Sequence, residues 1–251
     1  MRKLVSFLLI ASGIAVFFYP SAIDFYFEYQ QDKLIEAWDN NDPSLRAEAS
    51  GNAESAQESY AKLDKVFVDY SSQPQEDVTV EDDQSKIKEK TDTEGVRMVT
   101  KPEAETQMAS PTAEANSQTS RMLGILEISK ISVKLPILAG ATMQNLDVGA
   151  GHLSGTVFPG EGGNAAIAAH RSRSYGKMFN RLDELDSGDI ISVRNKEQTI
   201  QYKVTSTQVV TPSDVSVLGS TGKDTETLTL ITCTPIETAT HRLIVKAERI
   251  N

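Results

Sequence analysis

Short apolar runs separated by turn residues fill the chain from residue 121 onward, and this pattern constrains the fold more than any other feature. About 130 residues are a typical size for one domain with its own core. The runs that indicate strands are 124–128, 133–138, 164–169, 190–193, 199–204, 207–211, 228–232 and 243–250. Met178, Leu182 and Leu185 fit the apolar stripe of one short helix. Eight or so strands at this spacing favour a closed barrel or a sandwich.

The acidity of the chain belongs to a separate segment. Residues 24–120 carry 22 acidic and 9 basic residues, whereas residues 121–251 carry 13 and 14. Residues 71–120 have almost no large apolar side chain, so we predict an acidic, disordered linker there. The preceding residues 24–70 are predicted to be a partly helical juxtamembrane segment. The negative net charge of −10 argues against nucleic acid as a partner.

The N-terminus predicts export. Residues 4–23 are apolar over roughly the 20 residues that a helix needs to cross a bilayer, and Arg2 and Lys3 precede them. We therefore predict a membrane anchor over residues 1–23, a single-pass protein with a cytoplasmic N-terminus, and an extracellular domain over residues 121–251. A cleaved signal peptide is the alternative.

Cys233 is the single cysteine of the chain, and such a thiol is either inert packing or a nucleophile. It ends the apolar run 228–232. A thiol nucleophile needs an acid–base partner and a group that holds the developing oxyanion. Of the three histidines, His170 is the best placed, because it ends the small-residue run 164–169 next to polar residues. Arg242 opens the next run and can supply a fixed positive charge and several hydrogen-bond donors.

Four blocks of sequence follow one another in an order typical of one family. They are Gly149–His152 with Phe158–Asn164, Ala168–Arg171, Val210–Val215, and Leu228–Cys233 with Arg242 downstream. On these residues the chain resembles the sortases, which are membrane-anchored cysteine transpeptidases of Gram-positive bacteria. The resemblance covers essentially residues 122–251.

The resemblance implies an eight-stranded β-barrel with one or two short helices and a catalytic set of His170, Cys233 and Arg242. The Cys233 thiolate would attack the Thr–Gly bond of a Leu-Pro-x-Thr-Gly-like sorting signal on a surface protein. An amine, usually from a cell-wall precursor, would resolve the thioacyl enzyme. His170 would protonate the leaving amine and deprotonate the incoming one, and Arg242 would steady the oxyanion. Thr232 and Ala169 are expected to contribute to substrate binding.

The sequence also favours one subclass of sortases over another. Class C sortases polymerise pilins and usually carry a C-terminal membrane helix and an Asp-Pro-aromatic lid before the barrel. This chain stops at Asn251 without a second helix, and Asp42-Pro43-Ser44 lacks the aromatic residue. We therefore favour class D, which anchors proteins in housekeeping or sporulation, and keep class C as the alternative.

Other functions fit some of the same residues. In a plain cysteine peptidase, water would resolve the acyl intermediate. Cys233 and the three histidines could form a zinc site, but their spacings match no compact zinc motif. A non-catalytic binding module on a stalk is a further alternative. We predict no cofactor, and we see no acidic cluster that predicts calcium activation. His152 is interpreted as structural, and His241 is expected to face away from Arg242 because neighbours on a strand point to opposite sides.

Overall fold

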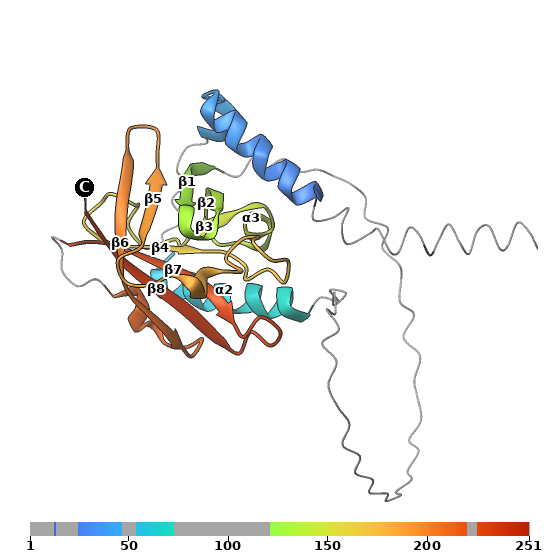
Figure 1. The fold of residues 1–251 in the computed structure, drawn as a ribbon, viewed down its shortest axis with the longest axis vertical. Coiled ribbons are helices and arrows are strands. Elements are labelled where there is room, and N and C mark those ends of the chain that lie inside the picture. Colours follow the sequence, from blue (N-terminus) through green and yellow to red (C-terminus); the bar gives the residue numbers. More distant parts are fainter. Residues whose placement is uncertain (1–12, 14–24, 47–53, 73–120, 220–224, 251) are drawn as a thin grey trace, which may run out of the picture. The chain divides into compact units, whose positions relative to one another are not determined.

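The computed structural model describes residue 13 and residues 25–46, 54–72, 121–219 and 225–250. Within these residues the predicted all-β fold is confirmed, because eight strands close into one barrel (Figure 1). The rest of the predicted anchor, and the predicted linker beyond residue 72, lie outside the described residues. The predicted domain boundaries therefore stay predictions.

The barrel has the strand order β1-β2-β3-β4-β7-β8-β6-β5. The strands are β1 (Met122–Ile128), β2 (Val133–Ala139), β3 (Ala150–His152), β4 (Gly163–Ala168), β5 (Ile190–Arg194), β6 (Thr199–Val210), β7 (Glu226–Thr234) and β8 (His241–Arg249). The pairs β2–β3 and β4–β7 are parallel, and the other neighbours are antiparallel. The parallel β4–β7 pair brings two segments that are far apart in sequence to the same edge of the barrel.

Three local predictions were wrong. The runs 199–204 and 207–211 form the single strand β6, whose register against β8 shifts between Val204 and Ser206. β3 lies between the predicted strand runs 133–138 and 164–169, where no strand was predicted. The predicted short helix is reduced to the 3-10 turn η3 (Leu182–Glu184), and Met178 has a φ of 48°. A residue in the left-handed region does not continue a right-handed helix.

Strand β7 is buried on both faces. Leu228 and Leu230 belong to the barrel interior, while Ile231 and Cys233 belong to a second apolar cluster on the outside. A strand that is covered on both sides reads as a continuous apolar run rather than an alternating one. The outer cover determines what can reach Cys233.

The outer cover of β7 is the helix α2 (Ala56–Ser72) together with the 3-10 turn η4 (Val215–Leu218) (Figure 1). α2 begins with a capping box, in which the Glu58 amide donates to Ser55 Oγ at 3.3 Å and the Ser55 amide donates to Glu58 Oε2 at 3.0 Å. Its side chains Tyr60, Leu63 and Phe67 are at most 2% exposed. Their burial against the barrel stabilises a helix of otherwise polar composition.

Residues 25–39 form another helix, as the helical spacing of Leu34, Ile35 and Trp38 indicates. Trp38 is 5% exposed and packs in a cluster with Met122 and Ile125 of β1. The short elements η1 (Pro43–Arg46), η2 (Ser129–Ile131) and α3 (Met143–Val148) complete the described structure.

The predicted localisation needs correction. Among the described residues, no helix has both the length and the apolar character that a membrane crossing requires. This finding contradicts the prediction of a single-pass membrane protein. Apart from residue 13, the apolar segment on which that prediction depended lies outside the described residues.

Candidate active site

Cys233 and Arg242 lie side by side on neighbouring strands. They are register partners in the antiparallel β7–β8 pair, and the side chains of such partners point to the same face about 5 Å apart. The face is the outer one, because Ile231 and Ile244, two residues from each, belong to the outer apolar cluster. The prediction that neighbouring strands bring the thiol and the guanidinium together is consistent with this register.

His170 reaches the same place from the other side of β7. β4 and β7 run parallel, with Ala168 opposite Ile231, and the Ala169 amide donates to the Ile231 carbonyl at 3.2 Å. His170 follows Ala168 by two residues and Cys233 follows Ile231 by two residues, so His170 lies beside Cys233. The backbone N–H of Arg171 also favours the Cys233 thiolate, which places the end of this segment against the sulfur. Three adjacent strands thus supply the three predicted residues.

All three side chains are buried. Cys233, His170 and Arg242 are each 1% exposed. Burial lowers the pKa of His170 to about 3. Burial also raises the pKa of the Cys233 thiol, although the Arg171 backbone and the Arg242 charge act in the opposite direction. At neutral pH this arrangement therefore holds a neutral imidazole and a neutral thiol.

Helix α2 contacts the imidazole and the guanidinium directly. Asp64 forms an ion pair with the Arg242 guanidinium. The Phe67 ring lies 5.1 Å from the same guanidinium and 5.8 Å from the His170 ring. Tyr70 stacks on His170 with ring centroids 3.7 Å apart and an interplanar angle of 12°. These contacts cover the site, so a peptide reaches Cys233 only after α2 has moved.

The Arg242 guanidinium is fixed in place by the backbone. Nη1 donates to the carbonyls of Ala239 at 2.7 Å and His241 at 2.8 Å, and Nη2 meets Asp64. The barrel therefore holds one end of the guanidinium, while the helix occupies the other end. The end held by Asp64 is the one that a substrate oxygen could take over.

Arg171 is a residue that the sequence analysis missed. Its Nη1 donates to Thr234 Oγ1 at 2.8 Å, its Nε donates to the Asn180 carbonyl at 3.2 Å, and Nη2 forms an ion pair with Asp183 at 2.8 Å. The side chain is 9% exposed. It ties the segment after His170 to the end of β7, so it keeps the imidazole next to the thiol. Its place directly after the predicted histidine was the signal available in the sequence.

The two predicted substrate-binding residues contact each other. Thr232 Oγ1 donates to the Ala169 carbonyl at 2.8 Å, and both residues are fully buried. This bond joins β7 to the segment that ends in His170. A role of Thr232 and Ala169 in substrate binding stays a prediction.

The remaining histidines have other surroundings. His152 Nε2 lies 2.8 Å from the Val157 carbonyl and 3.1 Å from Thr156 Oγ1, which agrees with a structural role. His241 is exposed next to the buried Arg242, as expected from strand alternation. Within the described ranges, no group of three or more His, Cys, Asp or Glu side chains could hold a metal ion. The prediction that the protein needs no cofactor remains untested.

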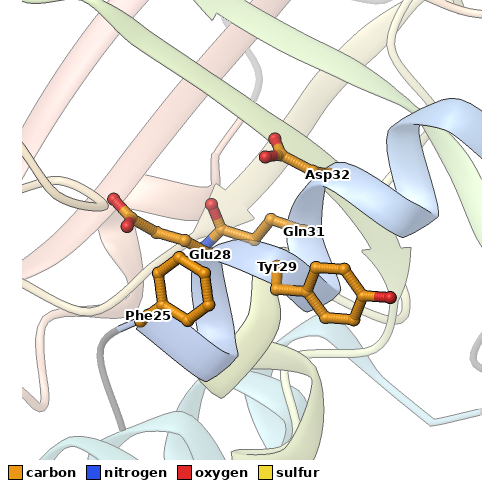
Figure 2. A pocket seen from close by; sticks show the side chains of 5 residues that line it. All are labelled: Phe25, Glu28, Tyr29, Gln31 and Asp32. Atoms are coloured by element: carbon orange, nitrogen blue, oxygen red, sulfur yellow. The ribbon is translucent and has the colours of Figure 1, made fainter. Parts of the chain in front are cut away.

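A pocket elsewhere is lined by the helix of residues 25–39 and is distinct from this site. Figure 2 shows its lining residues, Phe25, Glu28, Tyr29, Gln31 and Asp32. Glu28 forms an ion pair with Lys177 at 2.5 Å, so the helix meets the barrel loop at this point. None of the three predicted catalytic residues lines the pocket.

A thiol beside an imidazole and a guanidinium is an arrangement suited to thiol-dependent acyl transfer. Residues 126–250 match the family model of the sortase domain. Sortase D of Bacillus subtilis (strain 168) is 30% identical over 148 residues, which are 58% of this chain and 72% of that protein. Sortase A of Bacillus anthracis is 31% identical over 138 residues, 55% of this chain and 64% of that protein. The solved structure of Sortase A from Corynebacterium diphtheriae has a TM-score of 0.50 at 31% identity, covering 53% of this chain and 62% of that chain. The chain belongs to the sortase family, whose members are cysteine transpeptidases.

Proposed function

We propose that the protein cleaves a Leu-Pro-x-Thr-Gly-like sorting signal between Thr and Gly and transfers the acyl part to a cell-wall amine. The observation that supports this proposal is the strand register, which places Cys233 between His170 and Arg242. No other cysteine is present in the chain. The sorting signal and the amine acceptor come from the family to which the chain belongs.

The chemistry begins after α2 leaves the site. Cys233 transfers its proton to His170, and the thiolate attacks the carbonyl carbon of the threonine. The carbonyl oxygen becomes an oxyanion, and Arg242 donates to it through the nitrogen that Asp64 occupies in the closed arrangement. The C–N bond breaks, His170 gives its proton to the leaving glycine amine, and a thioester on Cys233 remains.

The second half reverses these steps with a new nucleophile. An incoming amine attacks the thioester carbon, Arg242 again stabilises the oxyanion, and His170 accepts the amine proton. The C–S bond breaks, the new amide leaves, and His170 can reprotonate Cys233. If water attacks instead, the same residues carry out peptide hydrolysis, which is the alternative function.

Product analysis tests the proposal and separates the two functions. The full chain is incubated with a library of Leu-Pro-x-Thr-Gly peptides, with and without triglycine as amine. We expect an amide product that requires triglycine and is absent in Cys233→Ala and His170→Ala. His241→Ala is the matched control, because this exposed histidine neighbours Arg242 on the same strand, and it should behave as the wild type. Equal turnover of Cys233→Ala and the wild type would refute the proposal.

The subclass remains part of the proposal. Similarity to Sortase D of Bacillus subtilis favours class D. Our argument against class C partly depended on a missing lid, whereas α2 does cover this site through Asp64 and Tyr70. Pilin polymerisation by a class C-like enzyme is therefore retained as the second candidate, and a pilin backbone lysine in place of triglycine tests it.

A further inference from the structure

His170 lies close to one carboxylate that our mechanism has not used. Both ring nitrogens are buried without a hydrogen-bond partner among the described residues. Nε2 lies 4.0 Å from Oδ1 of Asp147. We propose that Asp147 is a positioning residue, which orients the His170 ring and stabilises the imidazolium during acyl transfer. This inference depends on the function proposed above.

Hydrogen bonds and close backbone packing fix the position of Asp147. It belongs to α3, whose first turn is capped by a 3.3 Å bond from the Asn145 amide to Thr142 Oγ1. The Asn145 side chain also donates to the carbonyls of Ala139 at 2.9 Å and Gly140 at 2.8 Å, which ties α3 to the end of β2. Directly after the helix, a Cβ on Gly149 would lie 2.6 Å from the Pro136 carbonyl oxygen, so the chain approaches β2 closely there.

The electrostatics of Asp147 also point toward His170. Its side chain is 32% exposed, and burial raises the pKa of the carboxyl. His170 is its one ion-pair partner among the residues that the structure describes. A half-buried carboxylate without a bound cation favours a positive charge nearby, and the imidazolium of the proposed mechanism is such a charge.

The 4.0 Å between His170 Nε2 and Asp147 Oδ1 is the distance while α2 covers the site. Tyr70 stacks on the imidazole and holds its plane in one orientation. When α2 departs, the ring is free to turn, and a rotation that brings Nε2 within about 2.8 Å of Oδ1 gives a charge-assisted hydrogen bond. With Nε2–H donated to Asp147, Nδ1 is left to exchange the proton with Cys233 and the amines. Asp147 stays ionised throughout, so no further proton acceptor is needed.

The pKa of His170 in the open state depends on every charged or titratable group around it. These groups are Asp147 from α3, Tyr70 and Asp64 from α2, Cys233 from β7, Arg242 from β8, and Arg171 next to the histidine itself. The charges of Arg242 and Arg171 favour the neutral imidazole, whereas the Asp147 carboxylate favours the imidazolium. Asp64 and Tyr70 leave with α2, so Asp147 becomes the main counterion for the imidazolium.

The test compares Asp147→Asn with the wild type in the transfer reaction between the peptide and triglycine. We expect kcat to fall on the order of tenfold, a part of the full acid–base contribution, with KM unchanged. We also expect the acid limb of the pH profile of kcat/KM, which reports protonation of the resting neutral His170, to move to lower pH, because the imidazolium loses its counterion. Asp147→Glu keeps the charge and should restore the limb. Asp186→Asn is the matched control, because this carboxylate is 86% exposed and pairs with Lys130.

The pH at which kcat/KM falls does not depend on how much folded enzyme is present. A lower fraction of folded Asp147→Asn therefore cannot imitate the shift. An unshifted limb in Asp147→Asn, with the Cys233-dependent turnover of the wild type intact, would overturn this inference alone. Wild-type turnover that does not depend on Cys233 would instead overturn the proposed function. The two failures are therefore distinguishable.

Discussion

Arg242 is the residue whose surroundings most restrict its replacement. Its guanidinium is buried, donates to two backbone carbonyls and meets Asp64. The planar fork of arginine can hold the backbone and an oxyanion at once, whereas a lysine ammonium is a single point charge.

We expect Arg242→Lys to lower kcat about 10²- to 10³-fold, which is the cost of one lost oxyanion donor. Steady-state kinetics with the peptide and triglycine measure this effect. Arg249→Lys on the same strand, where the arginine pairs with Glu226 at the surface, is the control and should change kcat little. Turnover of Arg242→Lys within a few-fold of the wild type would show that Arg242 does not bind the oxyanion.

The buried neutral His170 also predicts how stability depends on pH. In the unfolded chain a histidine titrates near 6.5, whereas burial lowers the pKa of His170 in the folded chain to about 3. Between these values the unfolded state binds more protons, so stability falls as the pH falls, by at most about 1.4 kcal/mol per pH unit. His152, whose pKa is also lowered by burial, acts in the same direction.

Urea unfolding at pH 7 and pH 5 measures this contribution. We expect the loss of stability between the two pH values to be clearly smaller in His170→Gln than in the wild type. His241→Gln serves as the control, because that histidine is exposed. The same pH dependence in His170→Gln and the wild type would mean that His170 is not held neutral in the folded protein.

At the scale of elements, α2 controls access to the thiol. Asp64 is partly exposed, so its ion pair with Arg242 is worth roughly 1 kcal/mol. The stacking of Tyr70 on His170 is worth a similar amount, about 0.5–1.5 kcal/mol. Each contact therefore shifts the closed–open equilibrium of α2 by roughly fivefold.

We expect Asp64→Asn and Tyr70→Ala to raise the rate at which iodoacetamide alkylates Cys233, each roughly three- to tenfold. Mass spectrometry of quenched samples gives the rates. The exposed α2 residues Asp69 and Val68 supply the controls, Asp69→Asn and Val68→Ala. Rates that equal those of the controls would show that α2 does not limit access.

The sequence predicted the barrel better than it predicted the helix α2, which covers the site. The three predicted catalytic residues each end or open an apolar run, and the strand register brings them together. β3 has only three residues, the middle one is Gly151 and Gly149 precedes the strand, so it leaves no alternating pattern to read. The prediction missed β3 but counted β6 as two strands, so the expected number of strands was still right.

The sequence carries clear signals for α2, and most of this helix lies in the segment 24–70 that we predicted to be partly helical. Tyr60, Leu63, Phe67 and Tyr70 follow helical spacing, and Ser55 with Glu58 forms a capping box. That the helix would dock on the predicted catalytic residues could not be predicted, because this contact depends on side chains a hundred or more positions away.

For the whole molecule, α2 links stability to reactivity. Its buried side chains Tyr60, Leu63 and Phe67 cover the outer apolar cluster that includes Leu146 and Ile231. Leu63 and Phe67 each contribute about 1.5–3 kcal/mol when fully buried. Removing the helix therefore exposes apolar surface and frees the thiol at the same time.

We expect residues 121–251 alone to melt at a lower temperature than the full chain, by about ten degrees or more, and to alkylate faster at Cys233. Calorimetry and mass spectrometry measure the two quantities on the same samples. A chain that lacks only residues 73–118 keeps α2 and is the matched control. A domain of residues 121–251 that is as stable and as slow to react as the full chain would contradict this account.

The central claim is that Cys233 forms an acyl enzyme between His170 and Arg242. The most direct measurement is the intact mass of the Tyr70→Ala protein after brief incubation with a Leu-Pro-x-Thr-Gly peptide and acid quenching. We predict an added mass equal to the peptide up to its threonine, located on Cys233 by fragmentation and lost on addition of triglycine. Peptide cleavage at the Thr–Gly bond without any adduct on Cys233, or with an equal rate in Cys233→Ala, would contradict the account.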